Sequence, residues 1–229
     1  MPSITATKSA RIVGPAKSTQ ALARDASTGT VSPSPVATGG QTFAIQYFAS
    51  SGRGGGTFRY TRCFFHFDCS GITSTVSDAK LQIFSSGTLN TADLILVDSD
   101  AMGGVGNNPV GDDFNNLDFS TTYSSEVTSW TTTGTRLNEI TLNAAALSAL
   151  RDNDNFTCAL IDHDNDFQDT DTTGGSGSTA VGINFDINIK IDYNLAATGY
   201  THLPLNIAAA SVNQVNNVAS ADIHSIIDV

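Results

Sequence analysis

The sequence predicts an all-β fold: a jelly-roll β-sandwich with an extended N-terminal arm and a small C-terminal tail segment. Three observations support this prediction. First, charged residues make up only 14% of the 229 residues, against roughly 25% in an average soluble protein. Second, the chain has two glutamates and four lysines, so the residues that usually cover exposed helices are scarce. Third, short runs rich in β-branched and aromatic residues alternate with turn residues through the middle of the chain.

Residues 1–40 are expected to form the extended arm. Proline and glycine interrupt this segment at Gly14-Pro15 and again within 33–40, and both residues stop regular structure. The leading part of the chain is also basic. Residues 1–62 contain seven Lys or Arg and one Asp, a net charge of +6 (7 − 1), so the remainder carries −17 (−11 − 6). Two interpretations stay open: a solvated basic arm, or an arm that docks on an acidic surface, including that of another copy.

Residues 41–194 are expected to form the sandwich. Apolar residues occupy every second position from Val181 to Tyr193, which predicts one half-buried strand whose isoleucines face inward. A short helix is expected at 144–151, and a long loop at 100–118. The other expected strands cover 42–49, 57–68, 76–85, 92–98, 121–130, 136–143 and 156–162.

Residues 195–229 are expected to form a docking tail. Aromatic residues are absent after Tyr200, and a segment of this composition cannot bury enough apolar surface to fold alone. Isolated apolar residues at both ends of the chain would then be covered by a partner, with the ordering cost met on binding. The predicted assembly residues are Ile12, Val13, Val212, Val215, Val218, Ile223 and Ile226.

The densest acidic segment covers residues 162–171. Asp162, Asp164 and Asp166 alternate along it, so their carboxylates could converge on one Ca²⁺ ion. An EF-hand is excluded because Phe167 stands where its loop requires glycine. Two alternatives remain: a looser Ca²⁺ site, and a solvated acidic loop without a metal. No other cofactor is expected.

Tyr123 and Trp130 are candidates for a platform on which a sugar ring stacks, the alternative being burial in the core. Enzymatic activity is not expected. No serine lies in a Gly-x-Ser-x-Gly turn, and Glu126 and Glu139 would form a glycosidase pair only if folding brought them together. His66 is expected to be a structural histidine whose hydrogen bonds are satisfied within the fold.

Three cysteines, Cys63, Cys69 and Cys158, are expected to be buried free thiols of a chain made in a reducing cytoplasm. The net charge of −11 argues against nucleic acid as a general partner. No window of about 18 apolar residues exists, and the first residues lack the apolar core of a signal peptide. Neither a transmembrane helix nor export is therefore expected.

The run TRCFFHFDCSGI at 61–72, followed by VSDAKLQIF at 76–84, resembles the opening of carbohydrate-binding-type jelly rolls of the DNRLRE kind. In those modules a strand ending in Phe-Asp precedes a turn and an Ala-x-Leu strand. The resemblance covers residues 57–194 and implies a jelly-roll fold, but it carries over no ligand residues. Residues 210–229 are similar to short tail segments of structural proteins in tailed bacteriophages.

These resemblances imply a non-enzymatic bacteriophage virion structural protein, such as a capsid decoration, tail or fibre subunit. Such a protein would be made in the host cytoplasm and reside in the virion. It would act by binding other copies of itself, as a homotrimer by analogy with phage surface proteins, and by docking on other virion proteins. The alternative is a carbohydrate-binding module that recognises surface glycans. Neither hypothesis involves nucleic acid or a membrane.

Overall fold

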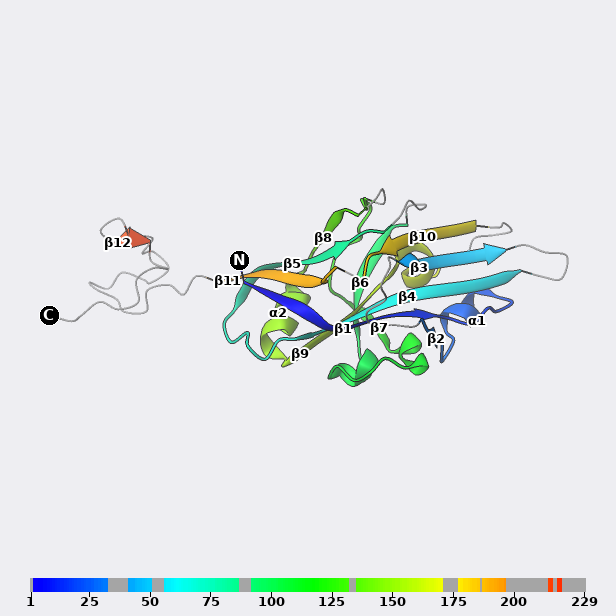
Figure 1. Ribbon diagram of the computed structural model, residues 1–229, viewed down its shortest axis with the longest axis horizontal. Coiled ribbons are helices and arrows are strands. Elements are labelled where there is room, and N and C mark those ends of the chain that lie inside the picture. Colours follow the sequence, from blue (N-terminus) through cyan, green and yellow to red (C-terminus); the bar gives the residue numbers. More distant parts are fainter. Residues whose placement is uncertain are drawn as a thin grey trace. The chain divides into compact units, whose positions relative to one another are not determined.

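The computed structural model describes residues 2–32, 41–50, 56–86, 92–131, 135–170, 177–185, 187–196, 214–215 and 218–219. The all-β prediction is confirmed: strands dominate these residues, and they form a curled antiparallel sheet (Figure 1). The chain divides into two units, Met1–Asn194 and Leu195–Val229. None of the helices in the described ranges has the length and apolar character needed to cross a membrane.

The elements up to residue 195 follow one another along the chain as strands with short helices between them. In order they are β1 (Ser3–Val13), α1 (Gln20–Arg24), β2 (Thr30–Val31), β3 (Gln41–Ser50), β4 (Thr57–Asp68), β5 (Val76–Phe84), β6 (Leu94–Ser99), the 3-10 helices η1 (Ala101–Gly104) and η2 (Gly111–Asn115), β7 (Leu117–Thr122), β8 (Leu137–Thr141), α2 (Ala144–Asp152), β9 (Asn155–Asp162), the π-helix η3 (His163–Phe167), β10 (Gly177–Ile183) and β11 (Lys190–Leu195). The second unit contains β12 (Gln214–Val215) and β13 (Val218–Ala219), which pair with each other.

The long strands β1 and β4 lie at the centre of the sheet and pair with each other along residues 6–13 and 61–67. On its other edge, β4 pairs with β3 through its first half and with β9 through its second half. Strand β1 likewise pairs with β2 at one end and with β11 at the other. The sheet order is β7-β6-β9-β4-β1-β11-β5-β8, with β10 added beside β3. The sheet therefore branches at both central strands.

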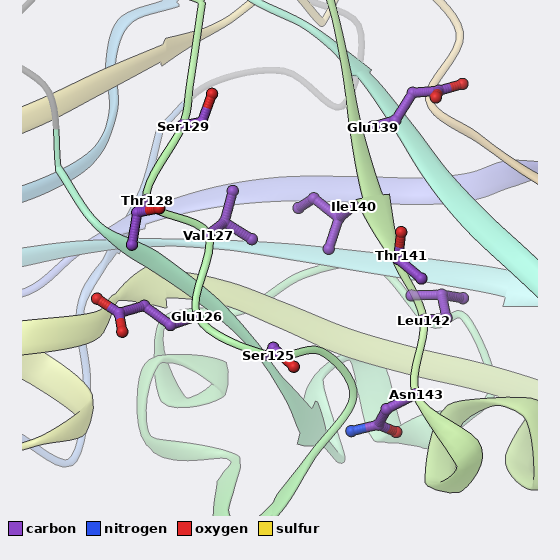
Figure 2. Close-up of a pocket in the computed structure, with 10 residues that line it drawn as sticks. All are labelled: Ser125, Glu126, Val127, Thr128, Ser129, Glu139, Ile140, Thr141, Leu142 and Asn143. Atoms are coloured by element: carbon purple, nitrogen blue, oxygen red, sulfur yellow. The ribbon is translucent and has the colours of Figure 1, made fainter.

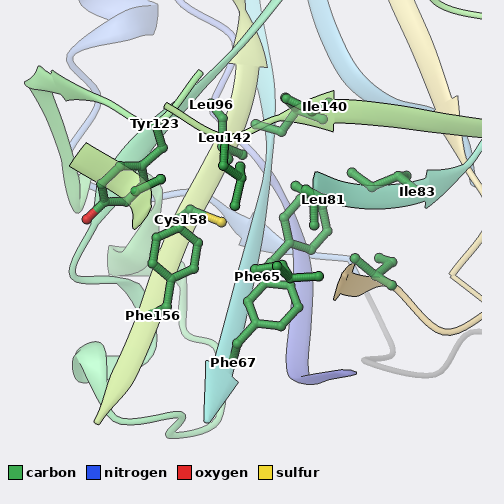
Figure 3. Close-up of a cluster of buried hydrophobic side chains, with 14 of the residues drawn as sticks. Phe65, Phe67, Leu81, Ile83, Leu96, Tyr123, Ile140, Leu142, Phe156 and Cys158 are labelled. Carbon is green, nitrogen blue, oxygen red and sulfur yellow. The ribbon is translucent and has the colours of Figure 1, made fainter. Parts of the chain in front are cut away.

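Strand β4 is buried on both faces, because its sequence TFRYTRCFFHFD is aromatic or apolar at neighbouring positions. Such runs are typical of strands that are covered on both sides. Phe65 and Phe67 point into one core (Figure 3), and Tyr60 and Phe64 point into a second core on the opposite face. Large partners are Leu81, Ile83, Ile140 and Phe156 in the first core, and Ile12, Ile95, Phe114 and Ile161 in the second.

Helix α2 confirms the helix predicted at 144–151. Asn143 is its N-cap: the side-chain oxygen accepts a hydrogen bond from the backbone N–H of Ala146 at 3.1 Å. The amide nitrogen of the same side chain donates to the carbonyl of Thr122 at 2.7 Å. Leu150 is fully buried in the first core. One asparagine therefore starts the helix and ties it to the end of β7.

The extended arm predicted for residues 1–40 differs from the structure, because Ser3–Val13 forms strand β1 in the middle of the sheet. Ile12 is fully buried in the second core, so it is not available to a partner, and Val13 is half-buried. The sequence SITATKSARIV alternates only weakly in hydrophobicity. Its strand conformation comes from backbone pairing with β4 and β11, which depends on tertiary context and not on local pattern.

The single strand predicted from Val181 to Tyr193 is two strands in the structure. Strand β10 pairs with β3, whereas β11 pairs with β1. Phe185 and Ile187 lie in the connection and are only half-buried. Period-two alternation persists through the connection, so it could not reveal where the chain leaves one strand and joins another. The inward-facing residues that are buried as predicted are Val181, Ile183, Ile189 and Ile191.

Because residues 181–193 form two strands with a connection between them, two isoleucine-to-alanine substitutions in this segment should lower the free energy of unfolding by different amounts. Ile191→Ala is expected to lower the free energy of unfolding by about 2–5 kcal/mol, because this side chain is fully buried in the first core. Ile187→Ala is the matched control and is expected to cost about 1 kcal/mol, since its half-buried side chain loses less buried area. Urea denaturation followed by circular dichroism measures both. Equal losses would contradict the division.

Candidate cation site and polar groove

Three side chains from two separate segments meet on the first unit: Glu126, His163 and Asp164. His163 Nδ1 lies 2.9 Å from Asp164 Oδ1 and 3.4 Å from Glu126 Oε1. One ligand atom from each residue lies within 4.8 Å of the other two. Within the described ranges, no other group of three or more His, Cys, Asp or Glu side chains has this metal-ligand spacing. We call these three residues the His163 cluster.

The fold fixes the imidazole of His163. Strand β9 ends at Asp162 and the chain continues into the π-helix η3, a rare conformation that is frequently found at functional sites. The backbone N–H of His163 donates to the carbonyl of Asp93 at 2.7 Å. Its ring stacks on Phe167 with centroids 5.8 Å apart, and the side chain is 14% exposed. One edge of the ring therefore reaches the surface in a defined orientation.

Glu126 is positioned by the residue that follows it. Val127 forms an antiparallel bridge with Leu94 through hydrogen bonds of 2.7 and 3.1 Å. Leu94 also pairs with Asp162 at the end of β9. Leu94, the first residue of β6, therefore pairs with the neighbour of Glu126 and also with the neighbour of His163.

Glu126 also lines a groove of about 450 Å³ between residues 125–129 and 139–143 (Figure 2). Seven of its ten lining residues are polar: five carry a hydroxyl or amide group, and two are glutamates. In Figure 2 the side chain of Glu126 extends away from Ile140 and from Glu139. The groove is thus polar, and its two glutamates point in different directions.

Glu139 has its own partners on the far side of the groove. Its carboxylate accepts hydrogen bonds from Lys80 Nζ and Gln82 Nε2, both at 2.9 Å. The hydrogen bond from Lys80 lowers the pKa of Glu139 below its usual range. A general acid requires the opposite shift, a raised pKa. Glu139 therefore lacks the raised pKa of a glycosidase general acid.

The structure does not bring Asp162, Asp164 and Asp166 together around one point. Asp162 is buried and accepts hydrogen bonds from the backbone and side chain of Asn165 and from Thr179. Burial raises the pKa of Asp162 above its usual value. Asp164 is exposed beside His163, and Asp166 is buried on another side of η3. The π-helix turns alternate carboxylates in different directions, so the predicted three-carboxylate Ca²⁺ site is not formed.

Asp166 instead pairs with Arg62, and both side chains are buried. Arg62 Nε and Nη2 donate to the two carboxylate oxygens at 2.7 and 2.6 Å. Arg62 also donates to the carbonyls of Phe114 at 2.7 Å and Arg24 at 2.9 Å. The guanidinium lies 4.2 Å from the ring centroid of Phe114. This network connects β4, η3, η2 and α1 over the second core.

Neither aromatic residue of the predicted sugar platform is exposed. Tyr123 and Trp130 belong to the first core and are 5% and 6% exposed. Residues 121–130 are a strand only as far as Thr122; beyond it, Ser124 Oγ accepts from the backbone N–H of Leu96. Both rings therefore pack in the core, and the prediction that they form an exposed platform for a sugar is wrong.

Of the predicted assembly residues in the C-terminal unit, Val212, Ile223 and Ile226 lie outside the described residues. Val215 and Val218 pair directly across β12 and β13. Their role in assembly stays a prediction.

The three cysteines are free and buried, as predicted. Burial raises the pKa of each thiol, so none has the thiolate character of a reactive cysteine.

His66 is buried on β4, with its ring nitrogens 2.7 Å from Thr7 Oγ1 and 3.2 Å from Asn155 Oδ1. Burial lowers its pKa below the ordinary value of 6.5. The stability contributed by the neutral ring is therefore present above about pH 6.5 and is lost as the pH falls below it. We expect the Tm of His66→Gln to depend less on pH than that of the native chain between about pH 7.5 and 5.5. Parallel Tm profiles from thermal melts would contradict this expectation.

The pairing of Glu126 with His163 was not predicted from the sequence. The two residues lie 37 positions apart (163 − 126), and no spacing rule joins a loop residue to a π-helix. The only local signal was the single histidine inside the acidic segment 162–171.

No protein-family model matches this chain, and no curated protein sequence is significantly similar to it.

Proposed function

We propose that the protein is a non-enzymatic structural protein of a bacteriophage particle, such as a capsid decoration, tail or fibre subunit. The observation that carries the proposal is the division into a β-sheet unit, Met1–Asn194, and a separate C-terminal unit, Leu195–Val229. A sheet unit with a separately organised C-terminal segment suits a subunit that is attached through that segment. The similarity of residues 210–229 to phage tail segments supports the same proposal.

Two further points belong to this proposal. The first is that the sheet unit is a jelly roll; the curled antiparallel sheet around the first core and the resemblance over residues 57–194 support it. The second is that the protein acts by binding and not by catalysis. The separate partners of Glu126 and Glu139 support this point. Its partners are then other copies of the chain, preferably in a homotrimer, and neighbouring virion proteins.

Deleting residues 195–229 tests the proposal. The shortened chain is expected to keep a cooperative thermal melt, because both cores lie before residue 195. It is expected to lose self-association and attachment to the particle. Sedimentation measures association, and mass spectrometry of purified particles measures incorporation. A chain in which a Gly/Ser linker of equal length replaces the tail is the matched control. A shortened chain that still assembles and docks would contradict the proposal.

Deleting residues 1–40, the other predicted docking segment, is not a clean test of assembly. Removing residues 1–40 would remove β1 from between β4 and β11, together with Ile12 from the second core. Loss of assembly would then follow from loss of the fold.

The groove beside Glu126 favours a second candidate, the binding of surface glycans. Hydroxyl and amide side chains line it, and such groups form the hydrogen bonds that sugars require. Binding of the isolated chain to a glycan array, reduced by Thr141→Val in the groove wall, would support this function. The absence of any array signal would remove it.

A further inference from the structure

We propose that the His163 cluster binds a divalent transition-metal ion of the Zn²⁺ class through His163 Nδ1 and one oxygen each of Glu126 and Asp164. The three groups come from two segments that Leu94 holds in place, so the site exists in the folded chain and not in the sequence alone. The inference is independent of the virion function proposed above.

His163 Nδ1 faces more hydrogen-bond acceptors than it can serve. Nδ1 carries at most one proton, yet two carboxylate oxygens face it, at 2.9 and 3.4 Å. A single N–H cannot point at both oxygens with good geometry. A metal ion would use the Nδ1 lone pair and both oxygens at once.

The separations are those of ligands around one ion. For a metal–ligand distance of about 2.1 Å, neighbouring ligand atoms lie about 3.4 Å apart in tetrahedral geometry and about 3.0 Å apart in octahedral geometry. The two separations from Nδ1, 3.4 and 2.9 Å, lie close to this range, and the third, between the two carboxylate oxygens, is at most 4.8 Å. Only a small adjustment of the exposed Asp164 and Glu126 side chains would complete the site.

The negative charge of the two carboxylates also favours a bound cation. Glu126 and Asp164 bring two carboxylates close together. Within the described residues, neither of them forms an ion pair with a lysine or arginine; both face His163 alone. Two nearby carboxylates repel each other unless a positive charge lies between them. A divalent ion supplies that charge.

The donor set selects the class of metal. Ca²⁺ and Mg²⁺ take oxygen ligands almost exclusively, whereas one imidazole nitrogen and two carboxylate oxygens suit Zn²⁺ and its neighbours in the first transition row. Three protein ligands leave at least one coordination position for water or a further ligand.

The other ring nitrogen of His163, Nε2, also has a polar neighbour. His163 Nε2 lies 3.4 Å from the side-chain amide of Gln168. With a metal on Nδ1, Nε2 carries the proton, and a flipped Gln168 amide presents its oxygen as the acceptor. A metal-bound histidine usually has such an outer partner. Stacking on Phe167 fixes the ring plane as well, so little orientation is lost on binding.

Titration of the full-length chain with Zn²⁺ tests the inference, after chelator treatment and dialysis. Isothermal calorimetry is expected to show one saturable site, and Co²⁺ to give d–d absorption bands on binding. Glu126→Gln and Asp164→Asn are each expected to weaken binding by about tenfold or more. The matched control is Glu139→Gln, which removes the same charge from the opposite wall of the groove and should leave the affinity unchanged. Circular dichroism confirms that each variant is folded.

Equal affinity in the native chain and all three variants would overturn the assignment, because the ion would then lie elsewhere. Absence of saturable Zn²⁺ binding to the native chain would overturn it too, as would tighter binding of Ca²⁺ than of Zn²⁺. Should Asp164→Asn fail to fold, Glu126→Gln decides alone, since the carboxylate of Glu126 forms an ion pair only with His163 among the described residues.

Discussion

Replacing Arg62 with methionine is expected to lower the free energy of unfolding by about 3–5 kcal/mol. The guanidinium is fully buried, and it makes two hydrogen bonds to Asp166 and one each to two backbone carbonyls. Methionine fills similar space but leaves the carboxylate of Asp166 buried without a counter-charge. The loss should therefore come mainly from that isolated charge and from the unpaired carbonyls.

Two controls separate this explanation from a general loss of packing. Arg151→Met breaks an exposed ion pair with Asp152 and is expected to cost less than about 1 kcal/mol. The double variant Arg62→Met with Asp166→Leu removes both charges and is expected to recover part of the stability. Chemical denaturation of all three variants measures these differences. A double variant that is less stable than Arg62→Met would show that the charge of Asp166 is not the cause.

Phe65→Ala is expected to have an effect of similar size, about 3–5 kcal/mol. Phe65 is fully buried in the first core on the most central strand of the sheet (Figure 3). Its removal leaves a cavity that the paired strands on both sides cannot collapse to fill. Phe119→Ala is the matched control, since its ring is 37% exposed on β7 and should cost much less. Equal losses in urea denaturation would contradict the assignment of Phe65 to the core.

Elements whose signal lies within the element itself were predictable from the sequence. Strand β4 has the predicted bounds, 57–68, because its aromatic run is long and bounded by glycine and a turn. Helix α2 was predictable because Asn143 caps a run of alanine and leucine. Strand β1 was not, since its own residues are small and polar and its conformation depends on β4 and β11.

The functional geometry was less predictable for the same reason. Asp162, Asp164 and Asp166 were grouped by spacing, but a π-helix separates them in space. The actual partner of Asp166 is Arg62, 104 residues earlier. Contacts across such separations are set by how the sheet closes, and no local pattern encodes them.

The position of β1 has a consequence for how the protein is made. Its first residues pair with β11, so one edge at this end of the sheet stays open until residues 190–195 have been synthesised. At roughly 5–20 residues per second, the ribosome needs roughly 6–25 s to proceed from the end of β4 to the end of β11. During that interval neighbouring nascent chains could add a strand to the open edge. Dense polysomes should therefore favour aggregation, and slower initiation of translation should raise the soluble yield.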